Sequence, residues 1–366
     1  MKIHFDNQIF RLQKYGGISR YFVRLAEQLK YLGHEPKILG GFHTNAYLRD
    51  LPSTLKTGKF LDKYPKRTIR LLRDSGNVIN QVYSTFSNPD ILHETYFSEV
   101  PFIRGGKPRV ITEYDCLHEI YPELFPVSYL KTKEKQAAFQ RADLILAISH
   151  QTKRDLLDYF SVPEHKIQVT HLAADPALPD EELEIPGNFT RPFLLYVGIR
   201  LKHKNFEPMV RAFADSKLLM GNFDLIVFTP NPFSSDEIDL FQRLGFAKDQ
   251  VSRESGDDRR LFGFFKKATA FIYPSKYEGF GIPPLEAMTY GCPVVCSSSS
   301  SLPEVVGEAA LTFDPENPEE MTSQMEKIAN DPILRAELIQ KGYNRIKLFS
   351  WEKTATDTLK LYKSIC

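Results

Sequence analysis

Short apolar runs alternate with longer amphipathic stretches along most of the chain, and this alternation predicts strands followed by helices. The stretch 18–32 carries its apolar residues at helical spacing, which predicts one of the intervening helices. Alternation of this kind favours parallel sheets that are covered by helices on both faces. The apolar runs that predict strands are residues 1–5, 90–92, 109–112, 143–148, 193–197, 223–228, 269–273, 293–296 and 310–313.

The alternation is interrupted once, by an acidic segment at residues 174–192 that contains four prolines and no clear period. Such a segment predicts a linker between domains. We therefore expect an α/β protein with two doubly wound, Rossmann-like domains, residues 1–175 and 190–348, that face each other across a cleft. The stretch 349–366 predicts one more helix, which would pack back on either domain.

Composition changes this prediction little. A chain of 366 residues allows two domains, and a net charge of +1 gives no indication of a nucleic-acid partner. No apolar run is long enough to span a bilayer, and the N-terminus lacks the apolar segment of a signal peptide. The four cysteines lack metal-ligand spacing, so we expect buried thiols in a cytoplasmic protein and no metal site.

Ligands of open α/β sheets bind beyond the carboxyl ends of the strands, so the loops at these ends carry the candidate chemistry. Gly16 and Gly17 follow the first strand and open a helix, a position that suits either an anion or a plain tight turn. Gly198 ends a later strand and is followed closely by Arg200 and Lys204. These cations suit either a phosphate group or a solvated basic turn.

Residues 277–290, "YEGFGIPPLEAMTY", place Glu278 and Glu286 eight positions apart, around a Gly-Phe-Gly turn. A helix is expected to begin near Pro283, and the free N–H groups before it would form an anion site. A dinucleotide fingerprint would need glycine where Pro284 stands, so NAD is not the expected ligand. The two carboxylates are equally consistent with a site and with solvated or helix-dipole positions.

Together these motifs resemble the retaining glycosyltransferases of family four, which have the GT-B fold and a Glu-x7-Glu motif. The resemblance extends across nearly the whole chain. Each motif alone is modest, but their order and spacing are specific. The matching segments are residues 16–17, 147–157, 196–206, 273–295, 300–315 and 349–355.

The resemblance implies a hexosyltransferase that takes its donor from a sugar nucleotide. In such enzymes the first motif glutamate lies by the transferred sugar and the second binds the ribose, which implies these roles for Glu278 and Glu286. Arg200 and Lys204 match the basic pair that neutralises the leaving diphosphate, and Gly17 would approach it from the other domain. The donor-binding positions that the resemblance implies are Gly16, Gly17, Gly198, Gly279, Phe280, Gly281, Ile282 and Glu286.

One loop departs from the family pattern. Many relatives carry His-Asp after the strand at 109–112, whereas this chain has Tyr114 and Asp115. A tyrosine hydroxyl still donates a hydrogen bond to a sugar, so we expect both residues at the catalytic site. His93 and His118 are candidate acceptor contacts, with ordinary packing histidines as the alternative.

The sequence allows several interpretations of the partners and the substrates of this protein. The stretch 56–73 has seven basic residues and one aspartate among apolar residues, which predicts either a solvated helix face or peripheral contact with an anionic membrane. The leading expectation is transfer of mannose from GDP-mannose to a saccharide or lipid-linked saccharide in surface polysaccharide synthesis, with a UDP-hexose as the alternative donor. A non-catalytic sugar-nucleotide-binding subunit and a sugar-nucleotide epimerase are the alternatives of other kinds.

We expect transfer to proceed without a metal cofactor, because cationic side chains and helix-end amides would stabilise the leaving diphosphate. The chain also lacks Asp-x-Asp, the usual metal motif of the other major glycosyltransferase fold. Treatment with EDTA should leave the rate of transfer unchanged. Activity that is lost with EDTA and restored by manganese would contradict this prediction.

Overall fold

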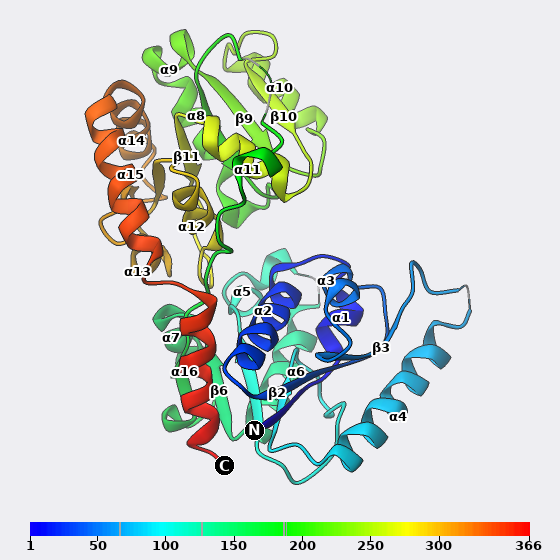
Figure 1. The fold of residues 1–366 in the computed structure, drawn as a ribbon. Helices are drawn as coiled ribbons and strands as arrows, with labels where there is room; N and C mark the ends of the chain where they lie inside the picture. Colours follow the sequence, from blue (N-terminus) through cyan, green and yellow to red (C-terminus); the bar gives the residue numbers. More distant parts are fainter. Residues whose placement is uncertain (66, 126, 186, 188) are drawn as a thin grey trace. The chain divides into compact units, whose positions relative to one another are not determined.

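The computed structural model describes residues 1–65, 67–125, 127–185, 187 and 189–366. The chain divides into two compact units, Met1–Leu172 with Trp351–Cys366, and Ala173–Ser350 (Figure 1). We call them the first and second unit. Within the described residues, no helix combines the length and the hydrophobicity needed to cross a bilayer.

The first unit is built on a sheet of seven parallel strands in the order β3-β2-β1-β4-β5-β6-β7. The strands are β1 Lys2–Phe5, β2 Glu35–His43, β3 Lys56–Phe60, β4 Ile91–Glu94, β5 Arg109–Glu113, β6 Leu144–Ala147 and β7 Ile167–Val169. Strands β4, β5 and β6 are buried along their whole length, as expected for a sheet covered on both faces.

Helices follow the strands of the first unit as the alternation predicted, and the helix predicted over 18–32 is α2. The helices are α1 Gln8–Leu12, α2 Gly17–Tyr31, α3 Ala46–Asp50, α4 Ile69–Ser87, α5 Leu117–Ile120, α6 Ser128–Arg141, α7 His150–Tyr159 and α16 Trp351–Lys363, with short 3-10 helices at Pro122–Leu124 and Glu164–Lys166.

The last helix, α16, belongs to the first unit and packs against α2 (Figure 1). A buried hydrogen bond of 2.5 Å joins the hydroxyl of Tyr362 to Nδ1 of His93. The other ring nitrogen of His93 lies 2.9 Å from Oγ1 of Thr112 on β5. The final helix is therefore tied to the strands β4 and β5 through one histidine.

The second unit contains six parallel strands in the order β10-β9-β8-β11-β12-β13. They are β8 Phe193–Val197, β9 Asp224–Phe228, β10 Val251–Glu254, β11 Ala270–Tyr273, β12 Val294–Ser297 and β13 Ala310–Phe313. The helices are α8 Phe206–Ala214, α9 Lys217–Asn222, α10 Ser235–Arg243, α11 Asp258–Lys267, α12 Ile282–Thr289, α13 Leu302–Val306, α14 Pro318–Asn330 and α15 Pro332–Ile346, with 3-10 helices η3 Asp180–Glu182 and η4 Lys202–Lys204.

The acidic segment 174–192 lies within the second unit, which begins at Ala173. Glu184 forms an ion pair with Arg260 of α11, and its carbonyl oxygen lies where a Cβ on Gly263 would clash. The backbone N–H of Leu178 donates to the hydroxyl of Tyr290 at 3.0 Å. The segment predicted as a linker is thus fastened along α11, while its positions 186 and 188 fall outside the described residues.

Four strands escaped the sequence pattern: β2, β3, β7 and β10. Strands β3 and β10 are the polar edge strands of the two sheets, and β7 is an edge strand of only three residues. Strand β2 begins with Glu-Pro and contains Gly40-Gly41, where its register with β3 shifts. Polar edges and a glycine bulge both remove the apolar run that identifies a strand.

The basic stretch 56–73 forms no single amphipathic helix. It contains β3, a loop and the first turn of α4, and position 66 lies outside the described residues. The guanidinium of Arg73 lies 5.4 Å from the ring centroid of Tyr64, and Lys56 donates to the carbonyl oxygen of Leu48 at 2.7 Å. Only residues 69–73 of the stretch share a helix, so the predicted contact with an anionic membrane stays a prediction.

Replacing Tyr362 with Phe removes the partner of a buried ring nitrogen. We expect the free energy of unfolding to fall by about 1–3 kcal/mol, the usual cost of leaving a buried polar group unsatisfied. Urea unfolding of the variant measures this loss. Tyr31→Phe is the control, because Tyr31 is 81% exposed on α2, and equal stability of the two variants would refute a role for the His93 bond.

Candidate functional site

The basic turn after β8 carries Lys204 to the end of the neighbouring strand. Gly198 follows β8 with φ 133°, a backbone conformation that favours glycine. The turn continues through η4 into α8, and β8 pairs in parallel with β11. As a result Lys204 Nζ lies 5.6 Å from the ring centroid of Tyr273, the last residue of β11.

Lys204 and Glu278 form a sheltered ion pair at this edge of the sheet. Lys204 Nζ donates to Glu278 Oε1 at 2.6 Å, and the two side chains are 18% and 14% exposed. Burial raises the pKa of Glu278, but the charge and hydrogen bond of Lys204 oppose burial, and the net effect is a pKa below the ordinary value. Glu278 is therefore an ionised carboxylate at neutral pH, held beside a cation.

A run of serines, residues 297–301, fixes the loop that carries Glu278. Ser300 Oγ accepts the backbone N–H of Glu278 at 3.1 Å and donates to its carbonyl oxygen at 2.5 Å. Ser301 Oγ is fully buried and lies 2.8 and 2.7 Å from the carbonyl oxygens of Glu278 and Phe280. The signal in the sequence that could have identified this run is its place directly after the apolar segment 293–296.

Helix α12 begins at Ile282, one residue before the predicted Pro283, and Gly281 is its N-cap. Gly281 has φ 108°, and a Cβ there would lie 2.7 Å from a methyl group of Leu302, so glycine is required. Glu286 lies one turn into the helix and is 8% exposed. One continuous loop–helix segment thus carries Gly279, Phe280, Gly281, Ile282 and Glu286, the donor-binding positions predicted there.

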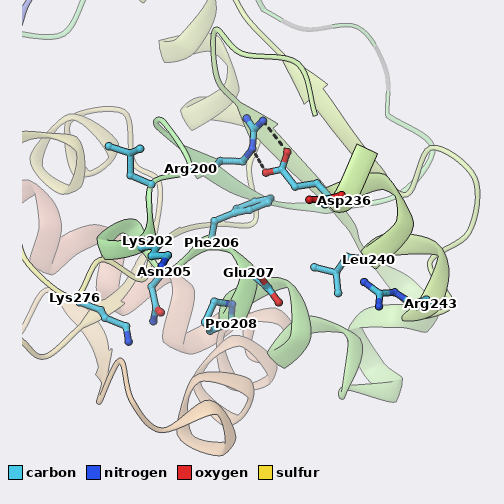
Figure 2. A pocket seen from close by; sticks show the side chains of 12 residues that line it. Arg200, Lys202, Asn205, Phe206, Glu207, Pro208, Asp236, Leu240, Arg243 and Lys276 are labelled. Atoms are coloured by element: carbon cyan, nitrogen blue, oxygen red, sulfur yellow. Dashed lines mark hydrogen bonds and ion pairs between the residues drawn. The ribbon is translucent and has the colours of Figure 1, made fainter. Parts of the chain in front are cut away.

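Arg200 is anchored to protein groups. Its guanidinium forms a bidentate ion pair with Glu237 of α10, in which Nε donates to Oε1 at 2.5 Å and Nη2 donates to Oε2 at 3.1 Å (Figure 2). Further bonds reach Thr229 Oγ1 at 3.2 Å and the carbonyl oxygens of Asn231 and Pro232 at 3.1 and 2.7 Å.

An arginine side chain has five N–H donors, and these five hydrogen bonds use all of them. The guanidinium therefore has no donor left for a diphosphate in this arrangement. The role predicted for Arg200 on the leaving group is not supported by its geometry, which instead fastens the basic turn to the loop after β9.

A cavity of about 440 Å³ lies beside this ion pair (Figure 2). Its walls come from the basic turn, the first turn of α8 and the outer face of α10, with Lys276 at one side. Acidic and basic side chains alternate along them, and neither Lys204 nor Glu278 is part of the lining. The cavity therefore differs from the site that the motif predicted.

In the first unit, Gly16 and Gly17 open α2 after β1 and α1. A Cβ on Gly16 would lie 2.3 Å from the side chain of Gln13, whereas a Cβ on Gly17 would meet no atom within 4 Å. Gln13 Oε1 accepts the N–H of Ser19 at 3.2 Å. The helix start is therefore partly capped within its own unit and open beside Gly17.

Tyr114 and Asp115 follow β5, where the strand ends. The Tyr114 ring packs 6.2 Å from that of Tyr21 and 6.4 Å from that of Phe97. The Tyr114 hydroxyl is buried, and the described residues offer it no hydrogen-bond partner. Asp115 Oδ1 accepts the N–H of Leu117 at 3.0 Å. The hydrogen bond from Tyr114 to a sugar stays a prediction. The hydroxyl group is not engaged by the described residues, whereas the ring is packed between other aromatic rings.

Lys135 of α6 holds this loop, although nothing in the sequence distinguishes it from the other lysines of its helix. Its Nζ donates to the carbonyl oxygen of Asp115 at 2.6 Å, to Glu113 Oε1 at 2.8 Å and to Glu119 Oε2 at 3.0 Å. Two carboxyl groups therefore share one buried ammonium group. Burial raises the pKa of Glu113 to about 8, although Lys135 opposes this shift.

The two candidate acceptor histidines occupy different environments. His93 is 1% exposed, both ring nitrogens are hydrogen-bonded within the first unit, and burial lowers its pKa to about 3. These bonds favour the packing alternative for His93, and an acceptor contact stays an untested prediction. His118 stacks on Phe125 at 4.4 Å and lines an open cavity of about 710 Å³. Burial, followed by the charge of Lys135, lowers the pKa of His118.

Two units, each with a parallel Rossmann-like sheet covered by helices, and a last helix returning to the first unit define the GT-B architecture of glycosyltransferases. Residues 15–178 match the family model "Glycosyltransferase Family 4", and residues 180–345 match "Glycosyl transferases group 1". The chain belongs to glycosyltransferase family four and is an enzyme of the hexosyltransferase type.

Similar proteins cover the same length. The O-antigen chain mannosyltransferase B of Escherichia coli is 27% identical over 369 residues, which is 95% of this chain and 96% of the relative. A sucrose-phosphate synthase from Thermosynechococcus elongatus has a TM-score of 0.76 at 18% identity, over 100% of this chain and 98% of that one. Anabaena Alr3699/HepE in complex with UDP and glucose has a TM-score of 0.73 at 15% identity, over 100% of both chains. At these identities the two structures show a shared fold alone.

The lowered pKa of Glu278 predicts how its contribution to stability depends on pH. A carboxylate whose pKa is depressed in the folded state stabilises the fold above its ordinary pKa of 4.5, and this contribution is lost as pH falls through the folded value. Each unit of depression is worth about 1.4 kcal/mol. Glu278→Gln should therefore be less stable than the wild type at pH 7, and the difference in Tm should shrink below pH 4.5.

Glu207→Gln is the matched control, because the Glu207 carboxylate is 60% exposed and pairs with Arg211 on the surface of α8. Its Tm should stay near that of the wild type at every pH. A Tm difference for Glu278→Gln that does not change with pH would show that the carboxylate carries no depressed pKa.

Proposed function

We propose that this chain is a retaining mannosyltransferase that moves mannose from GDP-mannose to a saccharide or lipid-linked saccharide during surface polysaccharide synthesis in the cytoplasm. The observation that carries the proposal is the Lys204–Glu278 ion pair in a chain of family four. The pair lies where β8 and β11 end, which is where open parallel sheets bind their ligands.

The chemistry of the pair fits glycosyl transfer. Breaking the anomeric C–O bond leaves positive charge on the sugar and negative charge on the departing diphosphate. Lys204 would stabilise the diphosphate, and Glu278, ionised beside it, would face the positive charge of the sugar. A fixed donor of this kind is worth about 3 kcal/mol in comparable sites. The start of α12 at Gly281 would add backbone N–H groups on the same side.

Arg200 has a positioning role in this proposal. Its five bonds to Glu237 and to the loop after β9 hold the turn that presents Lys204. In the first unit, Lys135 holds the loop of Tyr114 and Asp115 in a similar way, and these two residues would contact the acceptor.

The choice of mannose rests on the O-antigen chain mannosyltransferase B of Escherichia coli, which matches this chain over nearly its whole length. A UDP-hexose is the second candidate donor, because the structurally similar Alr3699/HepE holds UDP and glucose. A ligand that binds only the native state raises its stability by about 2.7 kcal/mol at a hundredfold excess over Kd.

The Tm should therefore rise with GDP-mannose and change little with UDP-glucose or ADP-glucose. Slow hydrolysis of the donor without acceptor, followed by chromatography of the nucleotide product, measures catalysis directly. Glu278→Gln should lose this hydrolysis, whereas Glu207→Gln should retain it. A larger rise in Tm with UDP-glucose than with GDP-mannose would indicate that the donor is a UDP-hexose. No hydrolysis or transfer with any sugar nucleotide would favour a non-catalytic subunit.

A further inference from the structure

Helix α4 packs on its own unit with small and polar residues. Its buried positions are Gly76, Asn80 and Ser84, one turn apart. Asn80 Nδ2 donates to the carbonyl oxygen of Leu39 on β2 at 2.7 Å. A Cβ on Gly76 would lie 3.2 Å from the backbone nitrogen of Phe42, so the helix and β2 approach closely at this glycine. The face of α4 that a soluble helix normally makes apolar is therefore polar here.

The apolar residues of α4 point away from its own unit. Phe86 is 86% exposed, Leu71 71%, Val78 63%, Ile79 54% and Val82 49%. In Figure 1, α4 lies at the periphery of the first unit, with one long side free of other elements of that unit. A contiguous exposed apolar stripe of this kind marks an interaction surface.

Three residues of this stripe, Ile79, Val82 and Phe86, follow the spacing of a helix–helix seam together with two partly buried residues, Leu72 and Ser75. Leu72, Ser75, Ile79, Val82 and Phe86 are separated by three, four, three and four positions, the pattern of helices that pack side by side. We call these five residues the α4 seam. We propose that the α4 seam binds the α4 seam of a second copy of this chain in antiparallel orientation.

The antiparallel register follows from side-chain size. Centred between positions 80 and 81, it places Ile79 against Val82 of the second copy, and the small Ser75 against the large Phe86. The two-fold axis repeats each of these pairs once. A small side chain opposite a large one fills the interface without steric overlap.

The charges of α4 agree with this occupant. In the antiparallel register the two helices overlap over positions 74–87, because α4 ends at Ser87. Asp74 stands opposite Ser87, and Arg70 and Arg73 lie beyond the overlap, whereas a parallel pair would set each charge against its own copy. From position 75 to 87 the helix carries no charged residue.

A lipid surface fits the same stripe poorly. At 100° per residue, Arg70 and Arg73 lie roughly 140° or more from the centre of the seam. A helix that lies on a membrane has its basic residues beside its apolar face, where they reach the headgroups. Here the basic side chains of the helix lie on the far side, and Arg73 stacks over Tyr64.

Sedimentation equilibrium of the full chain tests the proposal. The wild type should show a reversible monomer–dimer equilibrium, and Ile79→Glu should raise the dimer Kd at least about tenfold, which corresponds to about 1.4 kcal/mol. Ile333→Glu is the matched control, because Ile333 is an exposed isoleucine of α15 and should leave the dimer Kd unchanged. A wild type that stays monomeric, or an Ile79→Glu variant that dimerises as well as the wild type, overturns the proposal.

Co-sedimentation with vesicles of phosphatidylglycerol and phosphatidylcholine separates the two occupants. Vesicle binding that Ile79→Glu abolishes, in a wild type that is monomeric, would assign the stripe to lipid instead. Both measurements use purified chain without substrate, so their outcome is independent of the donor and of the proposed transfer.

Disulfide cross-linking tests the register. In a Cys366→Ser background the remaining cysteines, Cys116, Cys292 and Cys296, are buried. Diamide takes up two electrons as two thiols join. Ser75→Cys with Phe86→Cys should give a covalent dimer, whereas Phe86→Cys alone should not. In the antiparallel register the two copies of position 86 are about 16 Å apart along the helix, beyond the reach of a disulfide.

Equal cross-linking of the single and double variants would contradict the antiparallel seam. Cross-linking of neither variant would contradict the seam altogether.

Discussion

The ion pair of Lys204 and Glu278 is the interaction on which the candidate site depends. It lies beyond the ends of two adjacent parallel strands, on loops that Arg200, Ser300 and Ser301 hold in place. In this sheltered position the attraction is stronger than at a surface, and the loss of either partner would leave the other charge uncompensated. A diphosphate that reaches Lys204 has to share it with Glu278. The carboxylate would then turn its charge toward whatever lies on its other side, which in glycosyl transfer is the sugar.

Both units place a lysine at the carboxyl end of a strand, but they use it differently. Lys204 carries a single carboxylate and keeps one side accessible, as a ligand site requires. Lys135 is 3% exposed and is saturated by two carboxylates and a carbonyl oxygen, as a structural anchor requires. Burial raises the pKa of Glu113 to about 8, so its carboxyl group is mostly protonated at neutral pH and Glu119 balances the charge of Lys135. Lys204, with one carboxylate partner, is therefore a candidate reactive group, whereas Lys135, with all its hydrogen bonds made, has a structural role.

The sequence predicted those elements correctly whose residue pattern has only one structural explanation. The central strands are continuous apolar runs, and a run such as residues 143–148 has few alternatives to a buried strand. The edge strands β3 and β10 were missed because solvent allows polar residues there. The two motif glutamates were found from their spacing around a helix start, which is a local property of the chain.

The remainder depends on partners that are distant in sequence. Arg200 was predicted as a diphosphate ligand because its turn is basic, yet Glu237, thirty-seven positions further on, takes up its guanidinium. His93 was assigned to an acceptor because it follows a strand, but its partner Tyr362 is 269 positions away. The local sequence does not predict such pairs, because they form only when the sheet and its covering helices are assembled.

The return of α16 to the first unit has a consequence for biosynthesis. Residues 1–172 leave the ribosome early, but the helix that covers α2 and bonds His93 is translated last. Until then the nascent first unit exposes the apolar surface around Tyr21 that Trp351 later covers. Most of the first unit therefore emerges first, but it acquires its last helix only when synthesis of the chain is complete.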